Sequence, residues 1–293
     1  MINKKSRNIT KYLPYILLAP TMIFYILFWF RPVLTAFIEA FTDLDGGFTF
    51  QNIVVMFSEQ QFAVSLKNTI LFAVISVVIQ FILAFALALL LNKKFKGSSL
   101  LLFIALIPMA IPPTAVAILW NTGFQTLGWV NSLLMNFNLI AEPISWLSAR
   151  GIEGLLFLIA VDTWTVLPSV MIIILAGLQN MNKELEEAGK VFGATRFQIV
   201  KDIVYPILKP SIATALILRL ISSLQVWQLA VMLFGYGRVP FLVERVAYYN
   251  EMVPGLESSS KMAVTYSLFV TFIVLIFTFV YLKINKNSMK GVE

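Results

Sequence analysis

Hydrophobic side chains run through this chain in six long stretches with few or no charges, and the charged residues gather in the segments between them. A helix that crosses the hydrocarbon core of a bilayer needs about 20 apolar residues, which each stretch approaches or exceeds. The pattern predicts an all-α integral membrane protein, with six transmembrane helices in a single domain that covers residues 1–293. The predicted spans are residues 12–30, 68–92, 100–120, 154–178, 210–237 and 262–282. We expect the first stretch to be a retained span, because it is too long for a signal peptide and no small-residue cleavage site precedes Arg31.

The positions of Lys and Arg indicate how these helices are oriented, because short cytoplasmic loops keep an excess of basic residues. With the N-terminus inside, the cytoplasmic segments hold 15 basic residues and the opposite segments hold six. Four Trp residues also fall at outer ends of spans or in outer loops, where indole rings favour the headgroup layer. They are Trp29, Trp120, Trp129 and Trp146. The sequence therefore predicts a multi-pass protein of the cell membrane with both termini in the cytoplasm.

Composition narrows the function classes. Of the 293 residues, 59% are hydrophobic and only 13% are charged, and the mean hydropathy is +0.85. The chain has no Cys and no His, which excludes thiolate or imidazole metal sites, Cys or Ser-His nucleophiles and disulfides. No GxxxxGK[ST] phosphate loop is present, and the net charge of +7 belongs to the loops between spans. We therefore expect no catalytic or metal site, no cofactor and no nucleic-acid partner, and any ATP chemistry must belong to a partner.

The cytoplasmic segment 179–209 is longer and more charged than a connection between two spans requires. Asn182 is suited to cap a helix whose first turns carry acidic residues, where the helix dipole favours negative charge. Gly193 marks the end of that helix, and a second amphipathic helix is expected to stop before Pro206. Gly189 and Gly193, four residues apart, are expected to share a face that another surface can approach closely. The pattern alone leaves open a solvated helical hairpin without a partner.

The same segment carries a recognisable set of residues. They are Glu187, Ala188, Gly193, Ala194, Ile203, Pro206 and Pro210. This set resembles the loop motif EAAxxDGAxxxxxFxxIxLPxxxP of membrane permease subunits of ATP-binding-cassette (ABC) importers, with departures at Gly189, Phe192 and Tyr205. The stretches FTDLDGGFTFQNIVVMF, IPMAIPPTAVAILW and VDTWTVLPSVMIIILAGLQNMNKELEEAG are similar to carbohydrate-type permeases of the maltose and glycerol-phosphate importer kind. The resemblance covers nearly the whole chain.

This resemblance implies an ABC type I importer permease fold, in which a cytoplasmic coupling helix sits in a groove on a separate ATPase subunit. The coupling residues that it implies are Glu187, Ala188, Gly189, Gly193 and Ala194. It also implies a second permease subunit, expected to be a different chain, and an extracytoplasmic solute-binding protein. Phe192 stands where the family has Asp, so it does not reproduce a carboxylate's hydrogen bonds, although a buried aromatic ring can anchor an interface.

Polar residues inside the predicted spans are the candidates for a solute path. Asp162 and Arg219 lie where charge is costly, so each must be paired or face an aqueous cavity. A structural ion pair and a role in the path are equally compatible with the sequence. Ser222 and Gln225, three residues apart, are expected to share a helix face with the hydrogen-bonding groups that a sugar needs, while Trp227 packs against a neighbouring span. Ordinary hydrogen bonding between helices is the alternative.

Prolines interrupt two of the predicted spans. Pro108, Pro112 and Pro113 fall in the third span and Pro168 in the fourth. Each removes a backbone hydrogen bond, and we expect static kinks in otherwise continuous helices.

The favoured function is a permease subunit of an ATP-driven importer that carries a sugar or sugar-like solute. An ion-coupled secondary transporter is the first alternative, but no repeated halves of the kind common in such carriers are evident. An intramembrane enzyme would need convergent acids, bases or metal ligands, and one acid without His argues against it. A non-transporting assembly or sensory subunit is a third alternative that the sequence leaves open.

Overall fold

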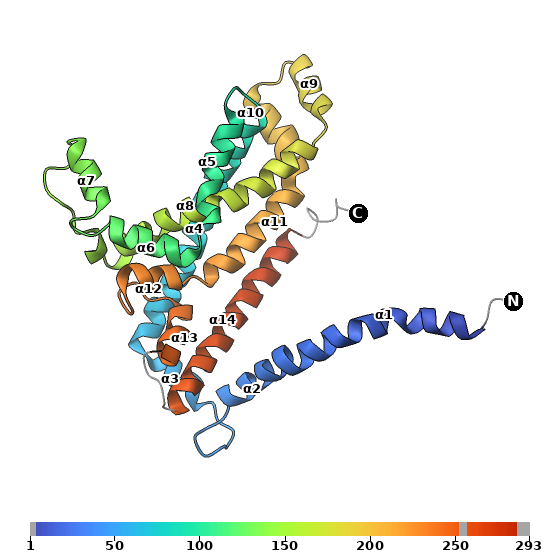
Figure 1. The fold of residues 1–293 in the computed structure, drawn as a ribbon, viewed down its shortest axis with the longest axis vertical. Helices are drawn as coiled ribbons and strands as arrows, with labels where there is room; N and C mark the ends of the chain where they lie inside the picture. The colour runs from blue at the N-terminus through green and yellow to red at the C-terminus, as the bar shows by residue number, and fades with distance from the viewer. Residues whose placement is uncertain (1–3, 252–256, 286–293) are drawn as a thin grey trace.

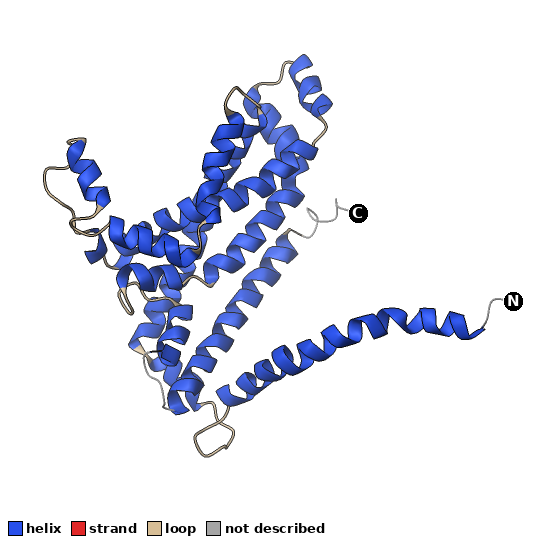
Figure 2. Cartoon of the chain, viewed as in Figure 1, coloured by secondary structure: helices blue, strands red, loops and turns tan. Residues whose placement is uncertain are grey.

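The computed structural model describes residues 4–251 and 257–285, and the basic residues Lys286 and Lys290 used for the topology prediction lie outside this part. The described helices are α1 (Lys4–Tyr25), α2 (Arg31–Ala40), α3 (Gln51–Ser58), α4 (Gln60–Asn92), α5 (Ser98–Ala110), α6 (Pro113–Gly123), α7 (Trp129–Asn136), α8 (Gly151–Asn180), α9 (Lys183–Val191), α10 (Arg196–Gln198), α11 (Tyr205–Leu224), α12 (Gln228–Phe234), α13 (Leu242–Glu251) and α14 (Glu257–Ile284). Two π-helical turns, η1 (Ile26–Phe30) and η3 (Ile199–Val204), and one 3-10 turn, η2 (Trp146–Ser148), join them. Figure 2 shows helices and loops without a strand in the described part, which confirms the predicted all-α class.

The centre of the molecule is the packing of α4 against α8, with α11 lying against both (Figure 1). Small side chains make the approach close: Ala84 and Ala88 of α4 are fully buried beside Met171 and Ile174 of α8. Small residues at a helix interface let two backbones come near each other, which raises the van der Waals attraction that holds membrane helices together. More than half of the most apolar window of α8, 56%, is buried inside the chain, so this helix forms the core.

The first helix is an arm that leaves this core. Helix α1 continues through η1 into α2, and the most apolar window of residues 12–40 has no buried residues. Figure 1 shows the arm extending away from the other helices. The predicted boundary at residue 30 is wrong, because the charge of Arg31 ends an apolar run without ending a helix. Pro32 follows the wider π-helical turn, which gives its ring room, so the helix continues to Ala40.

The third span is broken rather than kinked. Helices α5 and α6 meet at an angle of 96°. Ile111 and Pro112 between them are in extended conformations, and Pro113 begins α6 at the position where a missing N–H is tolerated. The prediction of a continuous helix over 100–120 is therefore wrong. Pro168, by contrast, lies inside the unbroken helix α8.

The fifth span differs from the prediction at both ends. The helix expected to stop before Pro206 instead runs on from Arg196 to Leu224, because the π-helical turn η3 precedes that proline as η1 precedes Pro32. At the other end, α11 stops at Leu224, and the short helix α12 follows after a break. The continuous helix predicted over 210–237 is therefore wrong.

Five described helices are long and apolar enough to cross a membrane, or six if the bent pair α5 and α6 forms one span. The second exceeds its predicted range by eight residues at its start only, and the fourth and sixth exceed theirs by two to five residues at both ends, because helix continues past the last apolar residue into polar flanks. Figure 1 shows α9 at one end of the bundle and α12 and α13 toward the other.

Candidate functional site

Helix α9 is the short helix that the charged segment 179–209 predicts, and its start is confirmed. Asn182 precedes it in an extended conformation, and its Oδ1 accepts a hydrogen bond of 3.0 Å from the backbone N–H of Glu184. Glu184 and Glu186 occupy the first turn, where their charge favours the helix dipole. Capping matters here because a helix of nine residues has little intrinsic stability.

The end of α9 is fixed by a pair of backbone hydrogen bonds around Gly193. The N–H of Gly193 donates to the carbonyl of Lys190, and the N–H of Ala194 donates to that of Gly189, both at 3.0 Å. This is a Schellman motif, and it requires the left-handed conformation that Gly193 adopts with φ of 77°. Gly193 therefore ends the helix and turns the chain. The spacing had predicted that it shares a helical face with Gly189, and this prediction is wrong.

Gly189 is closed off by its own chain. It is buried, and a Cβ added to it would lie 2.8 Å from Cδ1 of Ile203 and 3.4 Å from Cγ1 of Ile199 in η3. The prediction that this glycine opens the backbone to another protein is therefore wrong. Its lack of a side chain instead lets α9 pack against η3 and holds the short helix in place.

The opposite side of α9 and the turn after it are strongly exposed. Glu187 and Ala188 point to the surface, and Val191 and Phe192 are 85% and 89% exposed. Phe197 of α10 is 74% exposed. Three large apolar side chains within seven residues are therefore exposed beside charged residues. We call Val191, Phe192 and Phe197 the apolar tip.

The two charged residues inside the spans form a buried pair. Arg219 of α11 donates from its guanidinium to Oδ2 of Asp162 on α8, and both residues are less than 10% exposed. Gln80 of α4 completes the group: its Nε2 donates to Asp162 at 2.8 Å and its Oε1 accepts from Arg219. Sequence reasoning missed Gln80, although an amide in the apolar middle of α4 was a signal for it. The three side chains connect the three central helices.

Ser222 and Gln225 lie close together at the end of α11. Gln225 is the C-cap of the helix, and its backbone N–H donates to the carbonyl of Ser222 at 3.2 Å. Both side chains are exposed, whereas the neighbouring Ser223 is fully buried. The hydroxyl of Ser222 donates to the carbonyl of Leu218. The break between α11 and α12 thus displays polar groups on a surface of the central bundle.

A second polar cluster, which the sequence did not reveal, fastens α13. Glu59, between α3 and α4, accepts hydrogen bonds from Arg245 at 3.1 Å, from Tyr266 at 2.6 Å and from Tyr249. These groups come from residues up to 207 positions apart, which is why no local pattern indicated them. The guanidinium of Arg245 also lies 4.5 Å from the ring centre of Tyr248, within the range of a cation–π interaction.

Glu244 anchors the turn before α13 in the same region. Its carboxylate accepts from the backbone N–H groups of Gly237 at 2.7 Å and Phe241 at 2.9 Å, and the residue is 1% exposed. Burial raises the pKa of the Glu244 carboxyl above its ordinary value, and the two N–H donors oppose that rise. Asn68 of α4 donates to the carbonyl of Pro240 at 3.0 Å, so this turn is also tied to the core.

The long apolar helices, the broken third span and the exposed short helix between the fourth and fifth spans together define the class of importer permeases. Residues 80–291 match the family of binding-protein-dependent transport system inner membrane components, and the chain belongs to that family. It is therefore a multi-pass subunit of the inner membrane that serves transport. This assignment confirms the predicted importer permease over the ion-coupled carrier.

Individual relatives and solved structures match between 60% and 99% of the chain. The trehalose/maltose transport system permease protein MalF of Thermococcus litoralis is 31% identical over 94% of both chains. The lactose transport system permease protein LacF of Rhizobium radiobacter is 33% identical over 60% of this chain and 59% of its own. A bacterial ABC transporter that imports the acidic polysaccharide alginate contains a chain with a TM-score of 0.84 and 24% identity, over 99% of this chain and 100% of that one. This structural likeness confirms the predicted ABC type I importer permease fold.

Proposed function

We propose that this chain is the permease subunit of an ATP-driven importer for a sugar or sugar-like solute. The relatives named for trehalose and maltose and for lactose support a carbohydrate, and a further relative in Agrobacterium fabrum is named for sn-glycerol-3-phosphate. A related structure was solved with an alginate pentasaccharide-bound periplasmic protein, which supports delivery of the solute by an extracytoplasmic binding protein. ATP is hydrolysed in a separate ATPase subunit, and the path is completed by a second permease that is a different chain.

The apolar tip and the exposed face of α9 dock on the ATPase in this proposal. The observation that carries it is the exposure of Phe192, a large aromatic side chain at the end of a helix that is firmly capped at both ends. An aromatic anchor held on a rigid helix loses little conformational entropy on binding, so it transmits movement as well as affinity. Glu187 and Ala188 contribute the surrounding contacts, while Gly189, Gly193 and Ala194 set the shape of the helix and its turn.

In the same proposal the solute passes the break between α11 and α12. Ser222 and Gln225 supply its hydrogen bonds, because their side chains are exposed beside the central bundle. Asp162 and Arg219, which are buried in a pair, act by fixing α8 to α11 next to that path. The termini and α9 lie in the cytoplasm, as the distribution of basic residues indicates.

The docking surface is tested with Phe192→Ala in the assembled transporter. Truncating a central aromatic anchor typically costs 2 kcal/mol or more, so we expect about a 30-fold weaker association with the ATPase and a loss of solute-stimulated ATP hydrolysis. Phe137→Ala is the matched control, because Phe137 is 72% exposed but follows α7, far from α9 in the sequence. If the two variants bind and stimulate the ATPase equally well, the apolar tip is not the docking surface.

A further inference from the structure

The two breaks in the spans are connected through the helices that follow them. Helix α6 follows the break after α5, and α12 follows the break after α11. These two short helices pack against each other, as Figure 1 shows. Val116 of α6 and Leu233 of α12 are buried in one hydrophobic cluster. The second parts of the third and fifth spans are therefore in direct contact.

One side chain also joins the two helices by hydrogen bonds. The amide Nδ2 of Asn121 in α6 donates to the backbone carbonyl of Met232 at 2.9 Å and to that of Leu233 at 3.3 Å. These partners are 111 and 112 positions away in the sequence. A side-chain amide carries two N–H donors, so Asn121 can serve both carbonyls at once.

The two carbonyls need a donor from outside α12. The last four carbonyls of an α-helix have no partner within the helix. The N–H of Gly235 donates to the carbonyl of Val231 at 2.8 Å and ends α12. The N–H of Gly237, which would reach Leu233 if the helix continued, instead donates to a carboxylate in the turn before α13. Asn121 therefore supplies the C-terminal cap that the chain after α12 does not.

This cap acts on the break because α12 is short. Its seven residues span about 10 Å, and a helix of this length has little stability of its own. Trp227 precedes the helix and makes no side-chain capping hydrogen bond, so the start of α12 is not fixed in this way. The position of the break therefore depends on the far end of α12, where Asn121 donates and Leu233 is buried. Gln225 lies in the break, three residues before Gln228 begins the helix.

We propose that Asn121 is a positioning residue for solute recognition. It does not touch the solute: it caps α12 and so places Ser222 and Gln225 at the break for hydrogen bonds to a sugar. The inference rests on the proposed path at this break, and it adds that the third span, through α6, sets the geometry of that path. Because hydrogen bonds are directional, a displaced partner changes which sugars are accepted.

The cap is tested with Asn121→Leu in the assembled transporter, because leucine has a similar shape but donates no hydrogen bond. We expect faster hydrogen exchange over residues 225–234. In uptake experiments in which labelled maltose, trehalose and lactose compete, we expect the ratio of the sugars taken up to change about fivefold or more, the effect of one weakened hydrogen bond. A loss of folded transporter lowers the uptake of every sugar equally, so it does not change this ratio.

Further variants show whether the amide acts through the break. Asn121→Gln keeps the two N–H donors and should restore part of the parental ratio, whereas Asn121→Asp has no N–H and should resemble Asn121→Leu. If Asn121 acts through Gln225, the double variant Asn121→Leu/Gln225→Leu should show the ratio of Gln225→Leu alone. The two effects are then not additive, as expected for residues that act on one contact.

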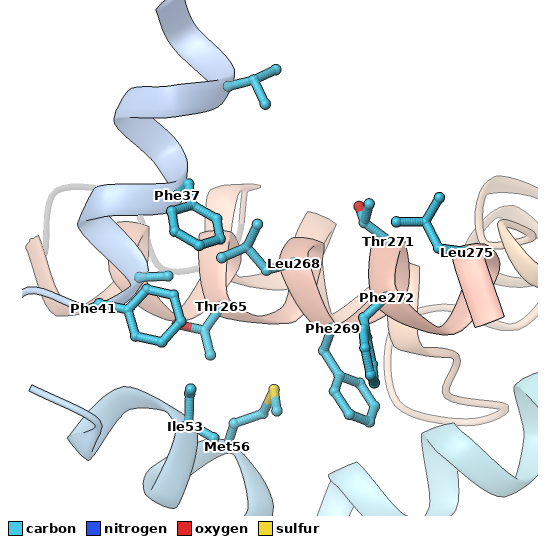
Figure 3. A pocket seen from close by; sticks show the side chains of 12 residues that line it. Phe37, Phe41, Ile53, Met56, Thr265, Leu268, Phe269, Thr271, Phe272 and Leu275 are labelled. Atoms are coloured by element: carbon cyan, nitrogen blue, oxygen red, sulfur yellow. The ribbon is translucent and has the colours of Figure 1, made fainter. Parts of the chain in front are cut away.

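Asn52 gives a matched control, because it makes the same kind of cap elsewhere. Its Nδ2 on α3 donates to the carbonyls of Ala40 and Thr42 after α2, at 3.0 Å and 3.2 Å. Figure 3 shows the neighbouring Ile53 and Met56 facing α14, against which α3 packs. Asn52→Leu therefore removes an equivalent pair of hydrogen bonds at another place. We expect it to leave the uptake ratio and the exchange of α12 unchanged.

The outcomes separate this inference from the proposed path. Unchanged exchange of α12 in Asn121→Leu would overturn the role of Asn121. Faster exchange with an unchanged uptake ratio would overturn it too, and Gln225→Leu then shows whether the path stands without it. Equal changes of the ratio in Asn121→Leu and Asn52→Leu would also overturn it. A ratio that Asn121→Leu changes and Gln225→Leu does not would support the role of Asn121 and move the solute contact away from Gln225.

Discussion

At the scale of single residues, the polar side chains inside the bundle are arranged in groups rather than alone. Asp162, Arg219 and Gln80 satisfy one another across three helices. Glu59 and Glu244 do the same around α13. Charged and amide groups in a membrane interior must find partners, because neither lipid nor apolar side chains offer hydrogen bonds. The effect of each polar side chain on stability therefore depends on its partners more than on its own position in the sequence.

The Asp162–Arg219 pair predicts a non-additive pattern of stability. Asp162→Leu or Arg219→Leu alone leaves a buried charge without its partner, and we expect each to destabilise the protein by about 3–5 kcal/mol. The double variant Asp162→Leu/Arg219→Leu removes both charges and should be closer to the parent than either single variant. Thermal unfolding of the purified transporter measures all three. A double variant as unstable as the sum of the singles would contradict the pairing, and one that is stable but does not transport would give the pair a direct role in the path.

The buried Glu244 predicts that the stability of the turn before α13 depends on pH. Because burial raises its pKa in the folded protein, protonation favours the folded state. Its stabilising contribution is full below the unfolded-state pKa and is lost as the pH rises through the folded-state pKa. Hydrogen exchange of residues 235–251, measured from about pH 4 to about pH 7 and corrected for the intrinsic rate, should therefore show weaker protection at higher pH.

Two variants distinguish the titration of Glu244 from its hydrogen bonds. Glu244→Gln should abolish the pH dependence and keep one of the two hydrogen bonds, because its amide oxygen replaces one carboxylate oxygen whereas its NH2 group cannot accept from the second N–H. Glu244→Ala should lose protection at every pH, since the buried N–H groups of Gly237 and Phe241 each lose a partner at about 1–3 kcal/mol. Unchanged pH dependence in Glu244→Gln would show that another group titrates.

At the scale of elements, breaks and wide turns shape the spans as much as their apolar length does. Pro32 and Pro206 each follow a π-helical turn and leave the helix continuous. Pro112 and Pro113, without such a turn, separate two helices by 96°. The break after Leu224 has no proline at all and exposes polar side chains. Breaks that expose polar groups are where a helical membrane protein can hydrogen-bond a solute.

The break after α11 is tested with Gln225→Leu. A sugar loses hydrogen bonds to water inside the path, and one missing partner costs roughly 1–3 kcal/mol, so transport should fall about 5- to 150-fold or the solute preference should change. Trp227→Phe is the comparison, since it keeps an aromatic side chain in the same break, and we expect a mild effect. Uptake of labelled sugars in cells with equal amounts of assembled transporter measures both. Normal transport in Gln225→Leu with none in Trp227→Phe would place the path on the other side of the break.

At the scale of the whole molecule, the two ends of the helix bundle carry different structures. Helix α9 with the apolar tip lies toward one end, and α12 and α13, fastened by Glu59 and Glu244, lie toward the other (Figure 1). The arm formed by α1 and α2 has no buried residues in its apolar window, so lipid or another subunit must cover it. An importer needs two different ends, because the ATPase acts at one end and the solute enters at the other.

The topology is tested with single cysteines, which can be introduced cleanly because the chain has none. A cysteine at Glu187, on the exposed face of α9, should react with a membrane-impermeant maleimide only in inverted vesicles or permeabilised cells. A cysteine at Leu127, which is 92% exposed in the loop before α7, should react in intact cells. Labelling of Glu187→Cys in intact cells would reverse the proposed orientation.

The sequence by itself determined the class of the protein and the local parts of the fold. Apolar length located the long helices but not the end of the first span or the breaks in the third and fifth, because a helix satisfies its own backbone and needs only a sufficient run of apolar residues. Local signals were equally reliable for α9, since Asn182 and Gly193 act on backbone groups within four residues of themselves. The loop motif that these residues frame also indicated the family correctly.

Only the tertiary structure decided which side chains meet and which surfaces stay open. Gly189 was expected to face a partner but is covered by Ile203, and Phe192 was a mismatch to a motif but is the most exposed part of the apolar tip. Gln80 and Glu59 gained their roles from partners 82 or more positions away in the sequence. The linear sequence pattern indicates the apolar faces and caps of each helix. The rotation of one helix against another sets these contacts, and it depends on packing along the whole length of both helices.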